Sequence, residues 1–125
     1  RLFERLDIAL DPFPYNGGTT TCEALWMGVP VLTRPGEVIV SRIGLSILMA
    51  AGLPELVAPS ESDYLRRAAD LAGDLPRLAA YRATLRGRMK ASPFMDAPRF
   101  ARNVEAAYRQ MWRRWCARQP PHPAA

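Results

Sequence analysis

Short apolar runs, separated by turn residues, occupy the first third of the chain. Residues 7–11 (Asp-Ile-Ala-Leu-Asp) form one run and residues 29–33 (Val-Pro-Val-Leu-Thr) form another, and both predict buried parallel strands. Between them lie a loop rich in turn formers, residues 12–18, and a segment of good helix formers, residues 19–27, followed by Gly28. Strand, loop, helix and strand make one βαβ unit, which predicts a parallel sheet with a right-handed crossover.

The pattern then becomes mainly helical. Residues 41–51 predict a second, largely buried helix, which Gly52 ends, and residues 56–58 predict a third, short strand. Ser62 and Asp63 are candidate caps for a helix that runs to about residue 72.

Two further helices are predicted after residue 75. Pro76 suits the first turn of one of them, and the other spans about residues 97–117. The last helix carries a wide apolar stripe, which predicts core packing rather than a ligand pocket. The stripe consists of Phe100, Val104, Tyr108, Met111, Trp112 and Trp115. Residues 119–125 predict a disordered tail, so the helical region proper is residues 60–118.

Composition narrows the class of protein. The 125 residues are 49% hydrophobic, which is enough for one domain with a real core. No apolar run approaches the roughly 20 residues that cross a bilayer, so no membrane association is expected. Cys22 and Cys116 are far apart, which fits free thiols in a reducing cytoplasm, and the single histidine, His122, has no neighbouring metal ligands. We therefore expect neither a metal nor another cofactor.

Charge is distributed unevenly. Up to residue 59 there are four basic and six acidic residues, a net charge of −2, whereas the remainder has thirteen basic and six acidic residues, a net charge of +7. A basic excess on helices can mark a nucleic-acid or membrane surface. The solvated face of amphipathic helices is the favoured interpretation, because no basic-aromatic pattern of an RNA-binding module is present.

Residues 16–23 carry the candidate chemistry, because they join the end of a predicted parallel strand to the start of a helix. Ligands of open α/β sheets bind at that edge, and free N–H groups at a helix N-terminus suit a diphosphate. The candidate binding residues are Asn16, Gly17, Gly18, Thr19, Thr20 and Glu23. The alternative is a simple loop followed by a capping box, in which Glu23 binds only the backbone N–H of Thr20. Neither a dinucleotide fingerprint nor a Walker A loop is present.

These same residues resemble a known family. Residues 11–21 (Asp-Pro-Phe-Pro-Tyr-Asn-Gly-Gly-Thr-Thr-Thr) and 23–33 (Glu-Ala-Leu-Trp-Met-Gly-Val-Pro-Val-Leu-Thr) are similar to the C-terminal catalytic lobe of the protein O-GlcNAc transferases. This is the TPR-linked glycosyltransferase family 41, which includes the plant SPINDLY-type enzymes. The similarity continues through residues 34–37 and 52–58 and, more loosely, to about residue 118.

The resemblance implies an α/β fold, the C-terminal half of a GT-B Rossmann-like lobe, with residues 1–59 as the nucleotide-sugar-binding part and residues 60–118 as helices packed on it. It implies metal-independent transfer, with inversion, from UDP-GlcNAc to Ser or Thr hydroxyls. Gly18, Thr19 and Thr20 would hold the diphosphate of the UDP-sugar donor, and Glu23 the ribose. A protein acceptor would bind through TPR repeats upstream. We expect this chain to be a piece of a longer enzyme, and we expect the piece alone to be inactive.

Two departures from the family leave the donor open. The animal enzymes have histidine at the position of Gly18 and aspartate at that of Glu23, so the variation in this chain resembles that of bacterial members. The choice of sugar also stays open, because SPINDLY-type members of the family use GDP-fucose. The lysine that stabilises the leaving diphosphate lies upstream, and Lys90, on a late helix, does not replace it, so no catalytic residue is assigned. The alternatives are a GT-B transferase with another donor or acceptor, or a truncated, non-catalytic domain that binds partners through its basic helices.

Overall fold

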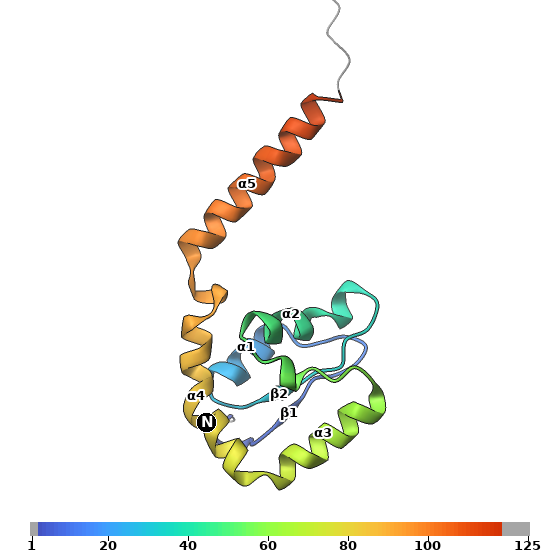
Figure 1. The fold of residues 1–125 in the computed structure, drawn as a ribbon, viewed down its shortest axis with the longest axis vertical. Coiled ribbons are helices and arrows are strands. Elements are labelled where there is room, and N and C mark those ends of the chain that lie inside the picture. The colour runs from blue at the N-terminus through green and yellow to red at the C-terminus, as the bar shows by residue number, and fades with distance from the viewer. Residues whose placement is uncertain (1–2, 119–125) are drawn as a thin grey trace, which may run out of the picture. The chain divides into compact units, whose positions relative to one another are not determined.

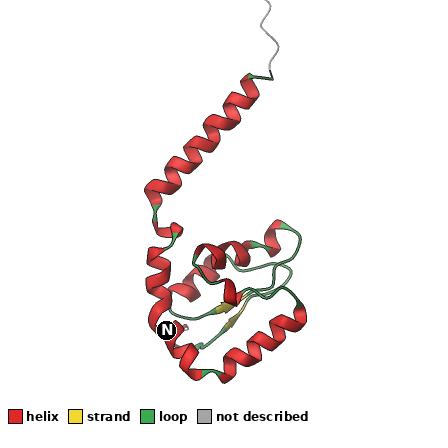
Figure 2. Cartoon of the chain, in the orientation of Figure 1, coloured by secondary structure: helices red, strands yellow, loops and turns green. Residues whose placement is uncertain are grey.

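The computed structural model describes residues 3–118. Contacts divide the chain into two units, Arg1–Met95 and Asp96–Ala125. Helices predominate, and the first unit also holds a pair of short strands (Figure 2). The division falls after Met95 rather than after residue 59, so the helices between residues 61 and 91 belong to the same unit as the strands. The predicted tail, residues 119–125, lies outside the described residues.

The first unit is built on a parallel strand pair, as the sequence predicts. Strand β1 (Ala9–Leu10) pairs with β2 (Val31–Leu32), and Ala9 stands opposite Val31. Both strands are shorter than predicted. The third predicted strand is present only as a bridge between Thr33 and Val57, whose parallel pairing continues the sheet beyond β2. The chain is therefore an α/β protein with parallel strands.

Helices lie on both sides of these strands (Figure 1). Helix α1 (Thr19–Trp26) and helix α2 (Ile43–Ala50) lie on one side, and α3 (Glu61–Gly73) lies on the other. Both predicted stop glycines have the backbone conformation that ends a helix, with φ of 81° at Gly28 and 69° at Gly52. A side chain at Gly28 would also meet the backbone oxygen of residue 82 at 2.8 Å, so that position requires glycine.

The helices after residue 59 begin at caps that differ in part from the predicted ones. Helix α3 is capped by Ser60, whose Oγ accepts a hydrogen bond from the Asp63 N–H at 3.1 Å. The predicted caps Ser62 and Asp63 are wrong, because both lie inside the first turn. Helix α4 (Leu75–Ala91) is capped by Asp74 and has a proline in its first turn, as predicted. Short 3-10 helices occupy Phe3–Arg5, Ile39–Ser41, Pro54–Leu56 and Pro93–Met95.

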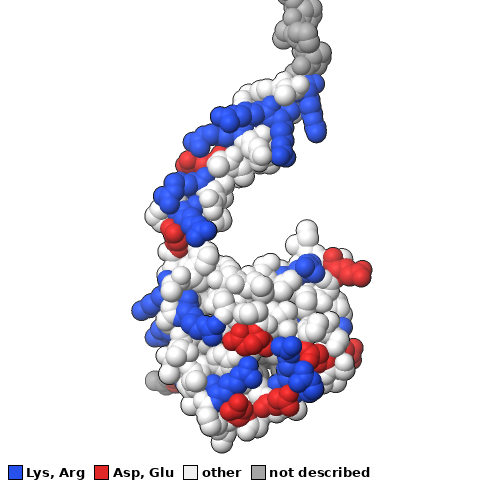
Figure 3. Space-filling model, in the orientation of Figure 1, with Lys and Arg blue, Asp and Glu red and all other residues white. Residues whose placement is uncertain are grey.

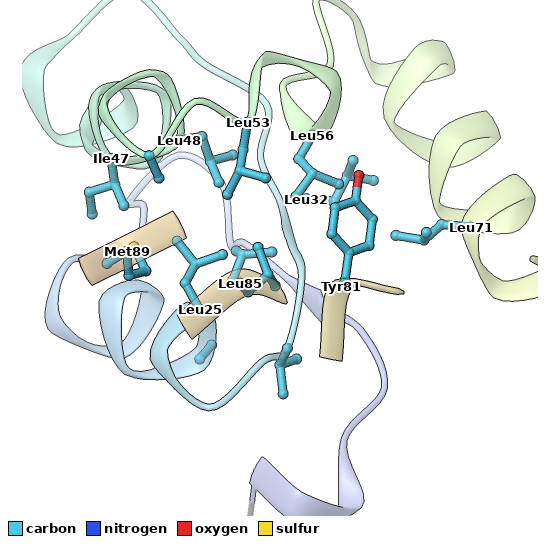
Figure 4. Close-up of a cluster of buried hydrophobic side chains, with 14 residues drawn as sticks. Leu25, Leu32, Ile47, Leu48, Leu53, Leu56, Leu71, Tyr81, Leu85 and Met89 are labelled. Carbon is cyan, nitrogen blue, oxygen red and sulfur yellow. The ribbon is translucent and has the colours of Figure 1, made fainter. Parts of the chain in front are cut away.

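The hydrophobic core lies where α1, α2, α3 and α4 meet the strands (Figure 4). Leu25, Leu48 and Leu85 come from three different helices, and each is fully buried. The other labelled core side chains are Leu32, Ile47, Leu53, Leu56, Leu71, Tyr81 and Met89. Helix α4 contributes its buried side chains Tyr81, Leu85 and Met89 at helical spacing, so one face of this helix packs on the core.

Arginines of α4 bind backbone oxygens at the ends of other helices. Arg86 Nε donates to the Trp26 oxygen at 2.9 Å, Arg82 donates to the Met27 oxygen at 3.2 Å, and Arg88 donates to the Gly52 oxygen. Acidic and basic side chains also lie next to one another on the lower part of the face shown in Figure 3. Within α3, Asp63 forms ion pairs with Arg66 and Arg67. Part of the basic excess of the chain is therefore used within the fold.

The second unit contains helix α5 (Ala97–Cys116), close to the predicted bounds. Its predicted apolar stripe is exposed: Phe100 has 68% of its surface accessible and Trp112 has 63%. The prediction of core packing is therefore not met by the described residues of this unit. Trp112 instead stacks on Trp115 along the same helix face, with 5.2 Å between ring centroids.

Candidate nucleotide-binding site

The predicted loop and helix start lie at the carboxyl end of β1. Helix α1 begins at Thr19, and the Cys22 N–H is the first to make the regular helical bond, to the Gly18 oxygen at 3.1 Å. The backbone N–H groups of Gly18, Thr19, Thr20 and Thr21 have no acceptor within residues 3–118. Thr19 and Thr20 are also exposed. The start of α1 thus presents unpaired donors at the edge of the sheet where ligands of α/β folds bind.

The capping-box alternative is wrong. The N-cap residue is Gly18, which has no side chain to cap with, and Thr20 lies inside the first turn. Glu23 is exposed, and its carboxylate has neither a hydrogen bond nor an ion pair to any residue that the structure describes. Its carboxylate is therefore available to a ligand.

Glu23 and Thr19 line a pocket of about 550 Å³ beside α1. The rest of its lining is mainly apolar and comes from α1, from the end of α4 and from the 3-10 helices at the two ends of the first unit: Phe3, Cys22, Trp26, Met27, Met89, Phe94 and Met95. Burial raises the pKa of the Cys22 thiol above its ordinary value, so this thiol is neutral. The pocket has the size and the mixed lining of a small-molecule site.

Asn16 and Gly17, also predicted to bind the donor, are used inside the protein. The Asn16 N–H donates to the Val40 oxygen at 3.0 Å, and its amide Nδ2 donates to the Pro12 oxygen at 2.9 Å. Asn16 is 1% exposed, and its Oδ1 has no partner within the described chain. The Gly17 N–H donates to Asp11 Oδ1 at 2.7 Å. These two residues therefore shape the loop, and their N–H groups are not free for a ligand.

Asp11 is the residue of this site that the sequence did not single out. It is 5% exposed, and its carboxylate accepts hydrogen bonds from the Gly17 N–H and from the Thr33 hydroxyl, the latter at 2.5 Å. Burial raises the pKa of Asp11 above its ordinary value of 3.8, and the two hydrogen bonds oppose that shift. Its place at the end of a strand, directly before a proline, is the one signal in the sequence that could have identified it.

Two structural absences complete the description of the site and its surroundings. Among residues 3–118, no group of three or more His, Cys, Asp or Glu side chains could hold a metal ion. None of the helices within the described range is both long and apolar enough to cross a membrane.

Parallel strands, helices on both faces and unpaired N–H groups at the carboxyl edge define an α/β unit whose open helix start is a candidate site for an anionic ligand. The model of glycosyl transferase family 41 matches residues 3–104 of this sequence, and the chain belongs to that family.

Curated relatives agree with this assignment. The chain is 49% identical over 119 residues to a probable UDP-N-acetylglucosamine–peptide N-acetylglucosaminyltransferase SPINDLY of Oryza sativa subsp. japonica, with 95% of this chain and 13% of the relative covered. It is 36% identical over 114 residues to a UDP-N-acetylglucosamine–peptide N-acetylglucosaminyltransferase of Caenorhabditis elegans, with 91% of this chain and 10% of the relative covered. The chain thus spans only about one eighth of the length of these relatives.

A solved structure supports the fold. An O-GlcNAc transferase mutant of Thermobaculum terrenum superimposes with a TM-score of 0.84 at 43% sequence identity, over 92% of this chain and 22% of that one. The agreement places the fold described here within that of an O-GlcNAc transferase, whose chain is several times longer than this one.

Proposed function

We propose that this chain is the donor-binding portion of a protein O-GlcNAc transferase, which transfers GlcNAc from UDP-GlcNAc to Ser or Thr hydroxyls with inversion. The observation that carries the proposal is the row of unpaired N–H groups at the start of α1, in a chain that belongs to glycosyl transferase family 41. Four consecutive donors at the positive end of a helix match the oxygens of a diphosphate.

The roles of the residues follow from their exposure. The N–H groups of Gly18, Thr19 and Thr20 bind the diphosphate, and the Thr hydroxyls add further donors. Because Gly18 has no side chain, the backbone itself makes the contact at this position. Glu23 lies one turn further along α1, and its free carboxylate accepts hydrogen bonds from the ribose hydroxyls.

Other elements of the reaction belong to the longer protein that we propose. The lysine that stabilises the leaving diphosphate and the TPR repeats that bind the protein acceptor lie upstream. The proposed site needs no metal, because backbone and hydroxyl donors and the positive end of the helix dipole stabilise the negative charge of the diphosphate. A cytoplasmic location suits the two free thiols of Cys22 and Cys116.

A GDP-sugar is the second candidate for the donor. The SPINDLY relative from rice is 49% identical to this chain, against 36% for the transferase of Caenorhabditis elegans. The family resemblance implies GDP-fucose as a further donor of SPINDLY-type members, so the higher identity favours a test of both nucleotides. The diphosphate contacts proposed for α1 are the same for either donor.

Isothermal titration of UDP, GDP and AMP into the full-length protein tests the proposal. We expect UDP to bind in the micromolar range and AMP to bind at least about tenfold more weakly, a difference of roughly 1.4 kcal/mol. Tighter binding of GDP than of UDP would assign the second donor. Absence of binding to both diphosphates would refute the proposed function.

Substitution of Glu23 separates the ribose contact from the diphosphate contact. Glu23→Gln keeps the size of the side chain and removes the charge, so UDP affinity should fall about five- to tenfold, because a hydrogen bond to a charged group is lost. Glu61→Gln, at an exposed position on α3, is the matched control and should leave the affinity unchanged. Equal UDP affinities in the two variants would show that Glu23 does not contact the donor.

A further inference from the structure

Asp11 connects the end of β1 to the loop that precedes α1. Its backbone N–H is fixed by the Leu32 oxygen at 2.9 Å, as a continuation of the strand pairing. Its side chain turns into the protein, where Oδ1 accepts the Gly17 N–H at 2.7 Å and Oδ2 accepts the Thr33 hydroxyl at 2.5 Å. Both carboxylate oxygens are therefore committed to partners on two separate segments of the chain.

The surroundings of this carboxylate leave little room for movement. Gly44 of α2 lies so close that an added Cβ would come within 3.0 Å of both Asp11 Oδ2 and Thr33 Oγ1. On the opposite side, the Tyr64 hydroxyl of α3 donates to the Asp11 backbone oxygen at 3.0 Å. Helices from both faces of the sheet thus hold Asp11 in place.

The loop itself is equally tight around Gly17. A Cβ added there would meet the hydroxyl oxygens of Thr21 and Thr20 at 2.7 and 2.8 Å. The Gly17 N–H therefore points to Asp11, while the side chains of the first turn of α1 pack over the other side of this glycine. Once Gly17 is fixed, the peptide groups that follow it have little freedom in direction.

We propose that Asp11 is the positioning residue of the diphosphate site: by binding the Gly17 N–H it directs the N–H groups of Gly18, Thr19 and Thr20 toward the ligand. The proposal rests on the proposed function. Asp11 does not touch the donor, and it acts through the geometry of the loop. A preorganised set of donors binds an anion more tightly than a loop that must first become ordered.

The test compares UDP with uridine, which lacks both phosphates, in the full-length protein. In Asp11→Asn a neutral amide oxygen replaces the carboxylate at the Gly17 N–H, and the amide N–H can donate to the Thr33 hydroxyl oxygen, so the contact to Gly17 is weakened from a charge-assisted to a neutral hydrogen bond. We expect UDP affinity to fall about three- to tenfold and uridine affinity to change less than about twofold. Thr33→Val is the matched control, because it removes the other partner of Asp11 and leaves the contact to Gly17 intact. It should keep the ratio of the two affinities.

Three results would overturn the proposal: unchanged UDP affinity in Asp11→Asn, tighter UDP binding once the negative charge is removed, or equal losses for UDP and uridine. Failure of the proposed function is distinguishable, because the unsubstituted protein would then not bind UDP at all.

Amide hydrogen exchange of the unsubstituted protein keeps the proposal testable if Asp11→Asn does not fold. The Gly17 N–H should exchange slowly in the free protein, whereas those of Thr19 and Thr20 should exchange quickly and become protected when UDP binds. Fast exchange at Gly17 in the free protein, at the rate of Thr19, would overturn the proposal, because the hydrogen bond to Asp11 would not be persistent.

Discussion

The close packing of Gly44 against Asp11 and Thr33 leads to a prediction about stability. In Gly44→Ala the new methyl group would lie closer than 3.0 Å to oxygens of both side chains, and 3.0 Å from the Thr33 Cβ. Neither side chain can withdraw easily, because Asp11 is 5% exposed and Thr33 is fully buried. The methyl group must therefore displace α2 or separate the Asp11–Thr33 hydrogen bond.

The magnitude follows from three contributions. Overpacking in a well-packed interior costs about 1–3 kcal/mol. Weakening a hydrogen bond to a charged group costs about 1.5–3 kcal/mol. Replacing glycine by alanine within a helix returns at most about 1 kcal/mol. The free energy of unfolding should therefore fall by about 1.5–5 kcal/mol.

Urea unfolding, followed by circular dichroism, measures this loss. With a slope of about 2 kcal/mol per molar urea, the midpoint should fall by roughly 0.8–2.5 M. Gly87→Ala is the matched control, because a Cβ at that position of α4 meets nothing within 4 Å. It should stabilise the protein by about 0.5–1 kcal/mol. A Gly44→Ala protein as stable as Gly87→Ala would refute the tight arrangement around Asp11.

Three further predictions concern the core, the arginines and pH. Leu25→Ala, at a fully buried position, should lower the unfolding free energy by about 3–5 kcal/mol, against less than about 0.5 kcal/mol for exposed Leu65→Ala, by urea unfolding. Arg82→Ala should lower the unfolding free energy by about 1–2 kcal/mol in the same assay, because the partly exposed Arg82 guanidinium binds several backbone oxygens. Arg99→Ala is the control and should leave the unfolding free energy unchanged. Burial raises the pKa of Asp11 above 3.8, so the folded state binds the carboxyl proton more tightly than the unfolded state does. The stability of the unsubstituted protein, relative to Asp11→Asn, should therefore fall as pH rises through the folded-state pKa. A constant difference in stability between the two proteins, measured by unfolding curves from pH 3 to 7, would contradict this.

Much of the fold follows from local sequence signals. The βαβ unit was predictable because short apolar runs and stop glycines are local features, and Gly28 and Gly52 adopt the positive φ that those predictions require. The cap of α3 was misplaced because Ser60, Ser62 and Asp63 all have capping side chains. Only the folded chain shows that the Asp63 N–H, and not its carboxylate, takes part in the cap.

The loop and helix start that form the candidate site were predictable in position but not in detail. The sequence places a loop and a helix start at the carboxyl edge, and the structure leaves the N–H groups of Thr19 and Thr20 unpaired there. The sequence could not show that the Gly17 N–H donates to Asp11 within the protein. The Asp11 carboxylate is itself held by the Thr33 hydroxyl, and these two residues are 22 positions apart in the sequence. Contacts of that kind depend on strand pairing, which no local pattern specifies.

The two ends of helix α1 differ: its C-terminal oxygens are bound by arginines, whereas its N-terminal N–H groups are unpaired. This difference connects the basic helices to the candidate site. At its C-terminus, the oxygens of Trp26 and Met27 are bound by the guanidinium groups of Arg86 and Arg82. Cations there stabilise the negative end of the helix dipole. At its N-terminus no protein group within the described chain occupies the N–H groups, so the positive end remains open to an anion. The arginines of α4 therefore secure α1 from one end, while its other end stays free for the diphosphate that we propose as its ligand. Part of the basic excess of this chain thus supports the helix that carries the candidate site.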